Sequence, residues 1–324
     1  MQKVTRLPWS LARFYLAHGC GTLRRKELAT MICTPETTLK EFLTEIYAPL
    51  RGIDERTIIV YSMTIKPFGR FLGHEPRLCD LEELTVARFL AHRVRERAPA
   101  TAAKDRSQLR ALWEMAARRG AIKTWPTIPL VKIPERVPEA WLTEEFERLL
   151  AEAQNERVIL DGIPAGLWWK ALLMVCYDTG ERITSVMGLR WSGWRGTSVL
   201  FRAENRKGQR RDIVRDISAQ TADAMLAIRG DRGPDDFVFP WPRNRQYLWR
   251  RLGIILGRAK LPAGRKDKFH RIRKTTASYF EAAGHSAQRL LDHADPATTR
   301  AYLDPRIVKT TSAPDVIPRP RLTG

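Results

Sequence analysis

Several side chains in the second half of the chain have the types and spacing needed to act on a phosphate group. His270 and Arg273 lie three positions apart, so on a helix they share a face, and a guanidinium holds two phosphate oxygens at once. Arg182 follows a tight-turn sequence, Thr-Gly-Glu. Tyr302 lies nine positions after His293, and a phenol attacks phosphorus when a neighbouring group accepts its proton. Taken singly, each has an ordinary interpretation as a solvated helix face, a surface arginine or a packing tyrosine.

The charge balance of the chain suggests a common partner for these side chains. Cleavage of a phosphodiester requires fixed positive groups on the nonbridging oxygens, and either metal ions or arginines supply them. The 324-residue chain has no evident carboxylate cluster for two metal ions, but its formal net charge is +20. Such an excess favours a polyanionic partner, and nucleic acid is preferred to a membrane surface. The sequence therefore predicts action on a nucleic acid with no cofactor.

The cysteines and the apolar runs indicate where the protein works. The four cysteines are widely spaced, with no C-x-x-C pair, which is typical of free thiols in a reducing compartment. His18 and Cys20 lie close together and Cys33 follows, but no fourth ligand has the spacing of a metal site. No apolar run approaches the roughly 18–20 residues needed to span a bilayer. We therefore expect a cytoplasmic protein that binds no metal and contacts no membrane.

Hydrophobic periodicity and proline predict the division into domains. Apolar residues at helical spacing, such as Leu39, Phe42 and Ile46, predict a bundle of about four helices in the first part of the chain. Prolines between residues 126 and 138 indicate a linker after it. The predicted parts are an N-terminal arm (1–33), a helical DNA-binding domain (34–125), a proline-rich linker (126–140), a catalytic domain (141–305) and a C-terminal tail (306–324).

Local signals predict the elements within these domains. We expect Pro67 to kink or split the second helix, Gly120 to end the fourth and Thr143 to cap the first helix of the second domain. The second domain is predicted to be mainly helical with one β-hairpin, because residues 198–202 and 212–217 are rich in Val, Ile and Phe and flank a basic polar turn. The expected fold class is therefore mainly α with a small β-hairpin (α+β).

The order of the motifs resembles the catalytic domain of the tyrosine recombinase (phage integrase) family. The matching elements are Thr179-Gly-Glu-Arg182, Lys207 at the hairpin tip, His270-Arg-Ile-Arg273, and His293 followed by Tyr302. The stretch Asp295-Pro-Ala-Thr-Thr-Arg-Ala-Tyr302 is similar to the family's pattern around its nucleophile, and residues 108–120 are similar to the last helix of its core-binding domain. The resemblance spans residues 37–305 and implies a SAM-like helical core-binding domain followed by a catalytic domain.

This resemblance implies a role for each matching residue. Tyr302 would attack the scissile phosphate and form a 3′-phosphotyrosyl bond, while Arg182 and Arg273 would hold the nonbridging oxygens. His270 and His293 would hydrogen-bond the phosphate, and His270 would also help to take the proton from Tyr302. Because the bond energy is kept in the phosphotyrosyl ester, the resemblance implies that religation needs no ATP.

The hairpin and two departures from the family's pattern need separate mention. Lys207 would protonate the departing 5′ oxygen, and Arg206 lies beside it in the same loop. Ser185 stands where the family usually has an acidic residue, and Asp292 stands where it usually has glycine. These two departures leave every predicted catalytic side chain in place.

Other basic residues are predicted to bind DNA phosphates, and such contacts give affinity but little sequence information. The residues with this prediction are Lys104, Arg106, Arg110, Arg206, Arg271 and Lys274. The resemblance implies a site-specific recombinase or integrase that acts on DNA as a homotetramer. Two alternatives are a DNA-relaxing enzyme of the type IB topoisomerase kind, which shares the chemistry, and a non-catalytic DNA-binding relic or regulator of the same fold.

Overall fold

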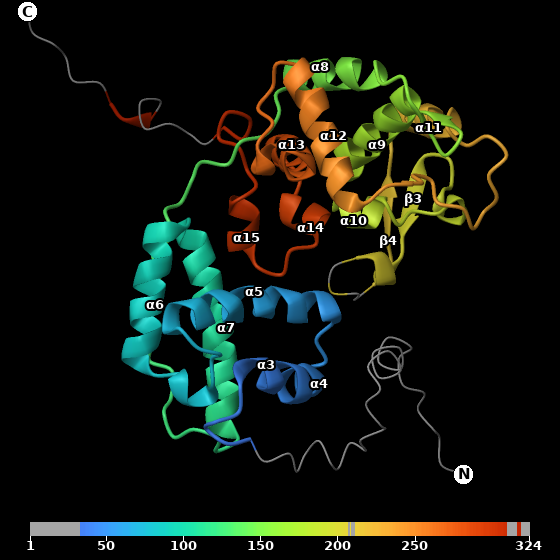
Figure 1. The fold of residues 1–324 in the computed structure, drawn as a ribbon. Coiled ribbons are helices and arrows are strands. Elements are labelled where there is room, and N and C mark those ends of the chain that lie inside the picture. The colour runs from blue at the N-terminus through green and yellow to red at the C-terminus, as the bar shows by residue number, and fades with distance from the viewer. Residues whose placement is uncertain (1–32, 207, 209–210, 310–315, 319–324) are drawn as a thin grey trace, which may run out of the picture. The chain divides into compact units, whose positions relative to one another are not determined.

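The computed structural model describes residues 33–206, 208, 211–309 and 316–318. The chain divides into two compact units, unit 1 up to Glu135 and unit 2 from Arg136 onwards (Figure 1). Most of the predicted N-terminal arm and of the C-terminal tail lies outside the described residues, and so does Lys207. Within the described ranges, no helix is long and apolar enough to cross a membrane.

Unit 1 is a bundle of helices that begin and end at residues with suitable capping chemistry. Its elements are α3 (Leu39–Glu41), the π-helical η1 (Phe42–Tyr47), α4 (Ala48–Arg51), α5 (Glu55–Leu72), the 3-10 turn η2 (Leu78–Asp80), α6 (Glu83–Glu96) and α7 (Pro99–Arg118). Thr38 and Glu41 form a reciprocal capping box at the start of α3, and Asp54 caps α5. Gly120 follows α7 with a left-handed φ of 71°, so the predicted helix end is confirmed.

The core of unit 1 explains why α5 tolerates an internal proline. Phe68 and Phe89 are fully buried with their ring centroids 5.1 Å apart, and Trp113 is buried beside them in the same core. The helix continues through Pro67 to Leu72, so the proline does not split it. Burial of the adjacent Phe68 ring contributes about 1.5–3 kcal/mol, which is comparable with the roughly 3 kcal/mol cost of an internal proline.

Unit 2 is mainly helical with two small antiparallel hairpins, in agreement with the predicted fold class. Its elements are α8 (Thr143–Gln154), β1 (Ile159–Leu160), β2 (Ile163–Pro164), α9 (Ala165–Thr179), α10 (Ile183–Val186), η3 (Trp191–Gly193), β3 (Ser198–Phe201), η4 (Ala203–Asn205), β4 (Ile213–Asp216), α11 (Ala219–Leu226), α12 (Arg245–Arg258), η5 (Arg265–Asp267), α13 (Phe269–Ala282), α14 (Ala287–Leu291) and α15 (Pro296–Arg300). The predicted hairpin is β3–β4, with Val199 opposite Arg215 and Phe201 opposite Ile213. The β1–β2 pair was not predicted, because strands of two residues are too short to show an alternating pattern.

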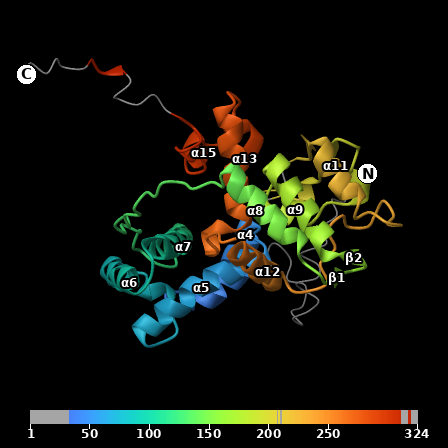
Figure 2. The same cartoon turned by 90° about the horizontal axis from the view of Figure 1, so that it is seen from above.

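Helix α9 is the central element of unit 2. Trp168, Trp169 and Leu172 are at most 1% exposed, and α9 packs against α8, α11 and α13 (Figure 2). Gly180 ends the helix with a left-handed φ of 59°, and a Cβ added there would lie 3.3 Å from Cγ2 of Thr276. Both the backbone conformation and the close approach of α13 therefore require glycine at this turn.

Arg271 is buried and fastens the first residues of unit 2 to α13. Its guanidinium carbon lies 3.8 Å from the ring centroid of Trp141, and its nitrogens donate to the carbonyl of Ala140 at 3.2 and 3.3 Å. It also pairs with Asp267 at 3.0 Å and is 4% exposed. The prediction that Arg271 binds DNA is therefore corrected, because an aromatic ring, a carbonyl and a carboxylate in the interior occupy its guanidinium.

The expected N-cap of α8 also needs correction, and the last helix ends before Tyr302. The N-cap of α8 is Leu142, and Thr143 is the first residue of the helix. The Leu142 N–H donates to the carboxylate of Glu145 at 2.9 Å, which is the half of a capping box that needs no polar side chain at the N-cap. Helix α15 ends at Arg300, and Tyr302 lies in the hydrogen-bonded turn that follows.

Candidate active site

Tyr302 lies between two histidines. The ring centroids of His270 and His293 are each 4.9 Å from that of Tyr302, and the interplanar angles of 67° and 61° make both contacts edge-on. The guanidinium carbon of Arg273 lies 5.8 Å from the same phenol ring. His270 and Arg273 come from one face of α13, whereas His293 and Tyr302 flank α15. The structure thus brings together residues that are far apart in the sequence and that sequence analysis assigned to one site.

Arg273 is held by backbone carbonyls. Its Nη1 donates to the carbonyl of Gly180 at 2.5 Å and its Nη2 to that of Leu291 at 2.8 Å. Burial, followed by the charge of Arg182, lowers the pKa of Arg273 to about 10, and the carboxylate of Glu181 partly offsets this. At neutral pH the guanidinium is therefore still charged. Its carbonyl partners fix its orientation without supplying a compensating negative charge.

Arg182 is the N-cap of α10, two residues after the turn at Gly180. In the part of the chain that the structure describes, its half-buried guanidinium has no hydrogen-bond or ion-pair partner. Its charge nevertheless lowers the pKa of Arg273 and of both histidines, so it acts on the same small region. Two arginines without a counter-ion form a ready site for an anion.

Thr299 orients His293, and sequence analysis did not single it out. The Nδ1 atom of His293 lies 3.1 Å from Oγ1 of Thr299, and its Nε2 lies 3.4 Å from Nη2 of Arg273. A guanidinium only donates, so Nε2 of a neutral ring accepts and Nδ1 carries the proton that Thr299 accepts. This contact selects one tautomer of His293. The only signal in the sequence for this role of Thr299 is its position inside the stretch that resembles the family's nucleophile segment.

Both histidines are neutral at pH 7. The pKa of His270 is lowered to about 4, first because the atoms packed around its ring exclude water and then by the charges of Lys274, Arg273 and Arg182. Burial and the two arginines likewise lower the pKa of His293 to about 4. Lys274, which was predicted to bind DNA, is half-buried, and burial lowers its own pKa. A neutral imidazole beside a phenol is a potential proton acceptor.

The backbone around Tyr302 is anchored within unit 2. Ser278 on α13 donates to the carbonyl of Tyr302 at 3.2 Å and accepts from the N–H of Asp304 at 2.9 Å. Asp304 is fully buried and accepts from the N–H of Ala140 at 2.7 Å. The Tyr302 N–H donates to the carbonyl of Thr299 at 2.8 Å. Contacts on both sides of the tyrosine therefore place its ring against α13.

Arg206 and Asp292 form a contact that the sequence did not predict. Arg206 is 7% exposed and pairs with Glu181 and with Asp292, in each case at 3.3 Å. The prediction that Arg206 binds DNA is therefore corrected, because its buried guanidinium is already paired with two carboxylates. Asp292 has a left-handed φ of 55°, the conformation for which glycine is suited at this position. An ion pair with the exposed Arg211 at 2.7 Å helps to offset that strain.

The DNA-binding residues predicted on unit 1 all have protein partners. Lys104 pairs with the fully buried Asp105 at 2.9 Å, and Arg110 pairs with a glutamate one turn later at 2.7 Å. Arg106 donates to the carbonyls of residues 128 and 129 at 2.7 Å each. Arg106 thus holds the start of the proline-rich segment on α7, whereas Lys104 and Arg110 remain accessible at the surface.

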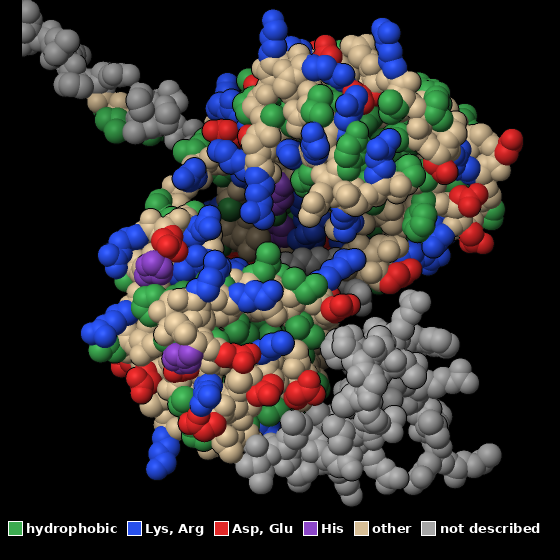
Figure 3. All heavy atoms as spheres, in the orientation of Figure 1, with side chains coloured by type: hydrophobic (Ala, Val, Ile, Leu, Met, Phe, Trp, Pro, Cys, Tyr) green, Lys and Arg blue, Asp and Glu red, His purple; other side chains and the backbone are tan. Residues whose placement is uncertain are grey.

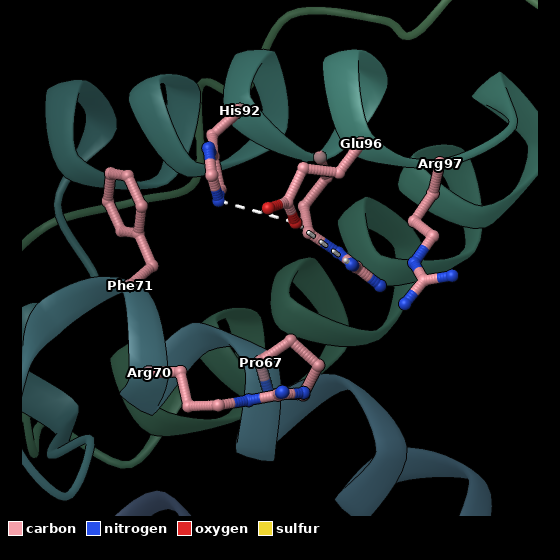
Figure 4. A pocket seen from close by; sticks show the side chains of 7 residues that line it. Pro67, Arg70, Phe71, His92, Glu96 and Arg97 are labelled. Atoms are coloured by element: carbon pink, nitrogen blue, oxygen red, sulfur yellow. Dashed lines mark ion pairs between the residues drawn. The ribbon is translucent and has the colours of Figure 1, made fainter.

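A pocket of about 540 Å³ lies between α5 and α6 of unit 1 (Figure 4). Its lining residues are Pro67, Arg70, Phe71, His92, Arg93, Glu96 and Arg97. Arg93 is fixed by the buried Asp105 at 2.9 Å. In the described ranges Arg70 and Arg97, at the border of the pocket, have no ion-pair or hydrogen-bond partner. Lys and Arg side chains gather over this part of unit 1, whereas Asp and Glu gather nearer α3 and α4 (Figure 3).

Two family models match the chain. The phage integrase family model matches residues 141–307, and the model described as phage integrase, N-terminal SAM-like domain, matches residues 39–120. The protein belongs to the phage integrase family, as the motifs predicted. Among the described residues no group of His, Cys, Asp and Glu is arranged to hold a metal ion.

Similar proteins and structures cover most of the chain. The tyrosine recombinase XerD of Shewanella oneidensis is 25% identical over 290 residues, which are 84% of this chain and 93% of that protein. A lambda integrase dimer bound to a COC′ core site matches with a TM-score of 0.64 and 19% identity, covering 93% of this chain and 87% of that one. A lambda integrase tetramer bound to a Holliday junction matches with a TM-score of 0.64 and 20% identity, covering 91% and 85%. The two structural matches show a shared fold.

We expect acidification to destabilise unit 2 through its two site histidines. Their pKa of about 4 in the folded chain lies below the roughly 6.5 of an unfolded histidine. Between these two pKa values the unfolded chain binds more protons than the folded chain does. The contribution of the two histidines to the free energy of unfolding is therefore complete above about pH 6.5 and is lost as the pH falls towards 4. Calorimetry between about pH 7 and 5 should show a smaller fall in unfolding temperature for His293→Gln than for wild type. Equal falls would contradict the assigned shift.

The left-handed backbone at Asp292 yields a stability prediction. Asp292→Ala loses the ion pairs and keeps the strain, whereas Asp292→Gly loses the pairs but relieves the strain. We expect the glycine variant to be more stable than the alanine variant by about 1 kcal/mol, which corresponds to roughly 2–4 °C in the unfolding temperature of a domain of this size. An alanine variant as stable as the glycine variant would rule out the strain.

Proposed function

We propose that the protein is a site-specific DNA recombinase that cleaves and rejoins strands through a 3′-phosphotyrosyl bond on Tyr302. The observation that carries this proposal is the position of the Tyr302 ring between His270 and His293, beside the buried charge of Arg273. A phenol in that position has a proton acceptor and an anion-binding group next to it. Membership of the phage integrase family and the name of the Shewanella relative, tyrosine recombinase, support the same activity.

The arginines bind the phosphate. Arg182 and Arg273 hold the nonbridging oxygens, whose negative charge must be stabilised as the phosphorus becomes five-coordinate. Arg273 is already oriented by two carbonyls, so little reorganisation is needed when the phosphate arrives. Arg182, without a described partner, exchanges only water for the phosphate.

Proton transfer accompanies the attack. The oxygen of Tyr302 forms a bond to phosphorus, its proton passes to neutral His270, and the bond from phosphorus to the 5′ oxygen breaks. A phosphate between the arginines adds negative charge beside the two imidazoles, which raises their pKa from the low values of the free protein. His270 is therefore a better base with DNA bound than without it, and His293 donates a hydrogen bond to the phosphate once protonated.

Lys207 completes the reaction in this proposal. It is assigned by the resemblance, lies on the loop between β3 and β4, and is outside the described residues. Its ammonium gives a proton to the departing 5′ oxygen, which would otherwise leave as a strongly basic alkoxide. Religation is the reverse sequence: the 5′ hydroxyl attacks phosphorus and gives its proton to Lys207, the bond from phosphorus to Tyr302 breaks, and His270 returns its proton to the phenol oxygen.

Assembly and location follow from the proposed activity. Exchange of strands between two sites needs two subunits on each site, and the related lambda integrase is a tetramer in its complex with a Holliday junction. We therefore propose a homotetramer on double-stranded DNA, acting in the cytoplasm. A type IB topoisomerase or a non-catalytic regulator is less well supported, because the named relatives are recombinases and because the tyrosine, histidine and arginine side chains of the site are all present.

Tyr302→Phe should abolish covalent attachment to DNA. Phenylalanine keeps the ring contacts with both histidines but has no oxygen to attack phosphorus. The measurement uses a pool of random-sequence duplexes with a nick, which traps the intermediate because the short cleaved fragment diffuses away. Wild-type protein should retain DNA through a denaturing gel and Tyr302→Phe should retain none.

Tyr279→Phe is the matched control. Tyr279 lies on α13 and its hydroxyl contacts Thr143 at 3.1 Å at the surface. This variant should form as much adduct as the wild type. Adduct in undiminished yield from Tyr302→Phe, or none from the wild type across the whole pool, would refute the proposed function.

We also propose that the pocket between α5 and α6 holds DNA phosphates through Arg70 and Arg97. Each lost phosphate contact lowers the slope of log affinity against log salt by about 0.9. The variant with both Arg70→Gln and Arg97→Gln should therefore bind non-specific duplex more weakly, with a slope smaller by about 1.8. Arg77→Gln is the control, because Arg77 is already paired with Glu36. An unchanged slope in the double variant would exclude the pocket from the DNA interface.

A further inference from the structure

Three residues that directly precede predicted catalytic residues belong to one ionic cluster. Glu181 precedes Arg182, Arg206 precedes Lys207 and Asp292 precedes His293. Arg206 pairs with Glu181 through Nη2 and with Asp292 through Nη1, at 3.3 Å each. One guanidinium therefore joins the end of η4, in the connection between β3 and β4, to the segments that carry Arg182 and His293.

Two further arginines of the hairpin share the same acids. Arg215 on β4 pairs with Glu181 at 3.4 Å and donates to the carbonyl of Leu290. Arg211 pairs with Asp292 at 2.7 Å. Since each acid has a second arginine, loss of Arg206 would leave neither Glu181 nor Asp292 without a cationic partner. The particular contribution of Arg206 is that it bridges the two acids.

The cost of burying this cluster argues for a role beyond stability. The side chains of Glu181 and Arg206 are 1% and 6% exposed, and buried ion pairs often stabilise a protein no more than apolar residues of similar size. The pairing also leaves polar atoms unsatisfied: in the described part of the chain, Oε2 of Glu181 and the Nε atoms of Arg206 and Arg215 are buried without a hydrogen-bond partner. What the cluster supplies is a fixed geometry between three segments.

One departure from the family's pattern belongs to the cluster. Asp292 stands where glycine is usual, and its carboxylate pairs with Arg206 and Arg211. The second carboxylate of the cluster is the buried Glu181, immediately before Arg182. Both acids meet at Arg206.

We propose that Arg206 is a positioning residue that clamps the β3–β4 hairpin to the Arg182 and His293 segments, and that this clamp sets the hairpin for protonation of the departing 5′ oxygen. The inference rests on the proposed strand cleavage. The side-chain partners of Arg206 among the described residues are two carboxylates and the carbonyl of Arg211, and Tyr302 is not one of them. Loss of Arg206 should therefore slow the step that needs an acid and spare steps that do not.

The test compares oxygen and sulfur as the leaving atom. Nicked duplexes captured by the wild-type protein from the random pool are resynthesised with sulfur in place of the bridging 5′ oxygen at the cleaved position. An alkylthiol has a pKa of about 8.5, against about 15.7 for water, so a thiolate leaves without a proton. Adduct formation is timed on both substrates, with DNA binding and unfolding temperature measured alongside.

Arg206→Gln should form adduct at least about tenfold more slowly than wild type on the oxygen substrate, because a general acid typically contributes a factor of about 10²–10⁴. On the sulfur substrate it should react within about threefold of wild type. Arg206→Lys keeps the charge but cannot bridge both acids, and it should show a smaller loss with the same rescue by sulfur. Both variants should bind the nicked duplex as the wild type does.

Arg202→Gln is the matched control on the same hairpin. Arg202 pairs with Asp212 at 2.9 Å, both side chains are exposed, and neither touches Glu181 or Asp292. It should match wild type on both substrates. Wild-type rates for Arg206→Gln on the oxygen substrate, or equal losses on oxygen and sulfur for both Arg206 variants, would overturn the positioning role. Absence of adduct from the wild-type protein would instead refute the proposed function itself.

Discussion

Repulsion between positive groups that are held together without a counter-ion is the physical constraint on which this structure depends. Exclusion of water by the packed atoms, followed by the neighbouring positive charges, lowers the pKa values of the two histidines. The carboxylate of Glu181 offsets part of the corresponding pKa shift of Arg273, but its ion pairs in the described part of the chain are with Arg206 and Arg215. Carbonyl groups hold Arg273 in place instead. The fold thus supplies the free energy that keeps these positive groups together.

The contrast between neighbouring arginines follows from this constraint. Arg271 and Arg273 are two positions apart on α13 and are equally buried, yet Arg271 is neutralised by Asp267 and stacked on Trp141. Residues two apart on a helix face different directions. One guanidinium therefore fixes parts of unit 2 to each other, and the other is the one proposed to hold the phosphate. The two arginines therefore differ in the groups that their guanidiniums contact and not in how deeply they are buried.

Sequence patterns predicted the fold class, the β3–β4 hairpin and the set of residues around Tyr302 because these depend on local periodicity and on ordered motifs. They did not predict the partners of Arg206 and Arg271, which come from segments far away in the sequence. The same reason applies to Thr299, whose function is visible only once His293 is placed against it. Capping at Leu142 was missed because the acceptor is a side chain inside the helix.

The neutral state of the site histidines connects the free protein with its proposed reaction. In the free protein, a base with a pKa near 4 hardly accepts a proton from a phenol whose ordinary pKa is about 10. A bound phosphate cancels part of the arginine field, so the imidazole becomes more basic at the place where a phosphorus is available for attack. In the proposed reaction, the positive charges that hold the phosphate are also those that, after burial, make His270 a weak base in the free protein. The proposal therefore couples activation of Tyr302 to binding of the phosphate.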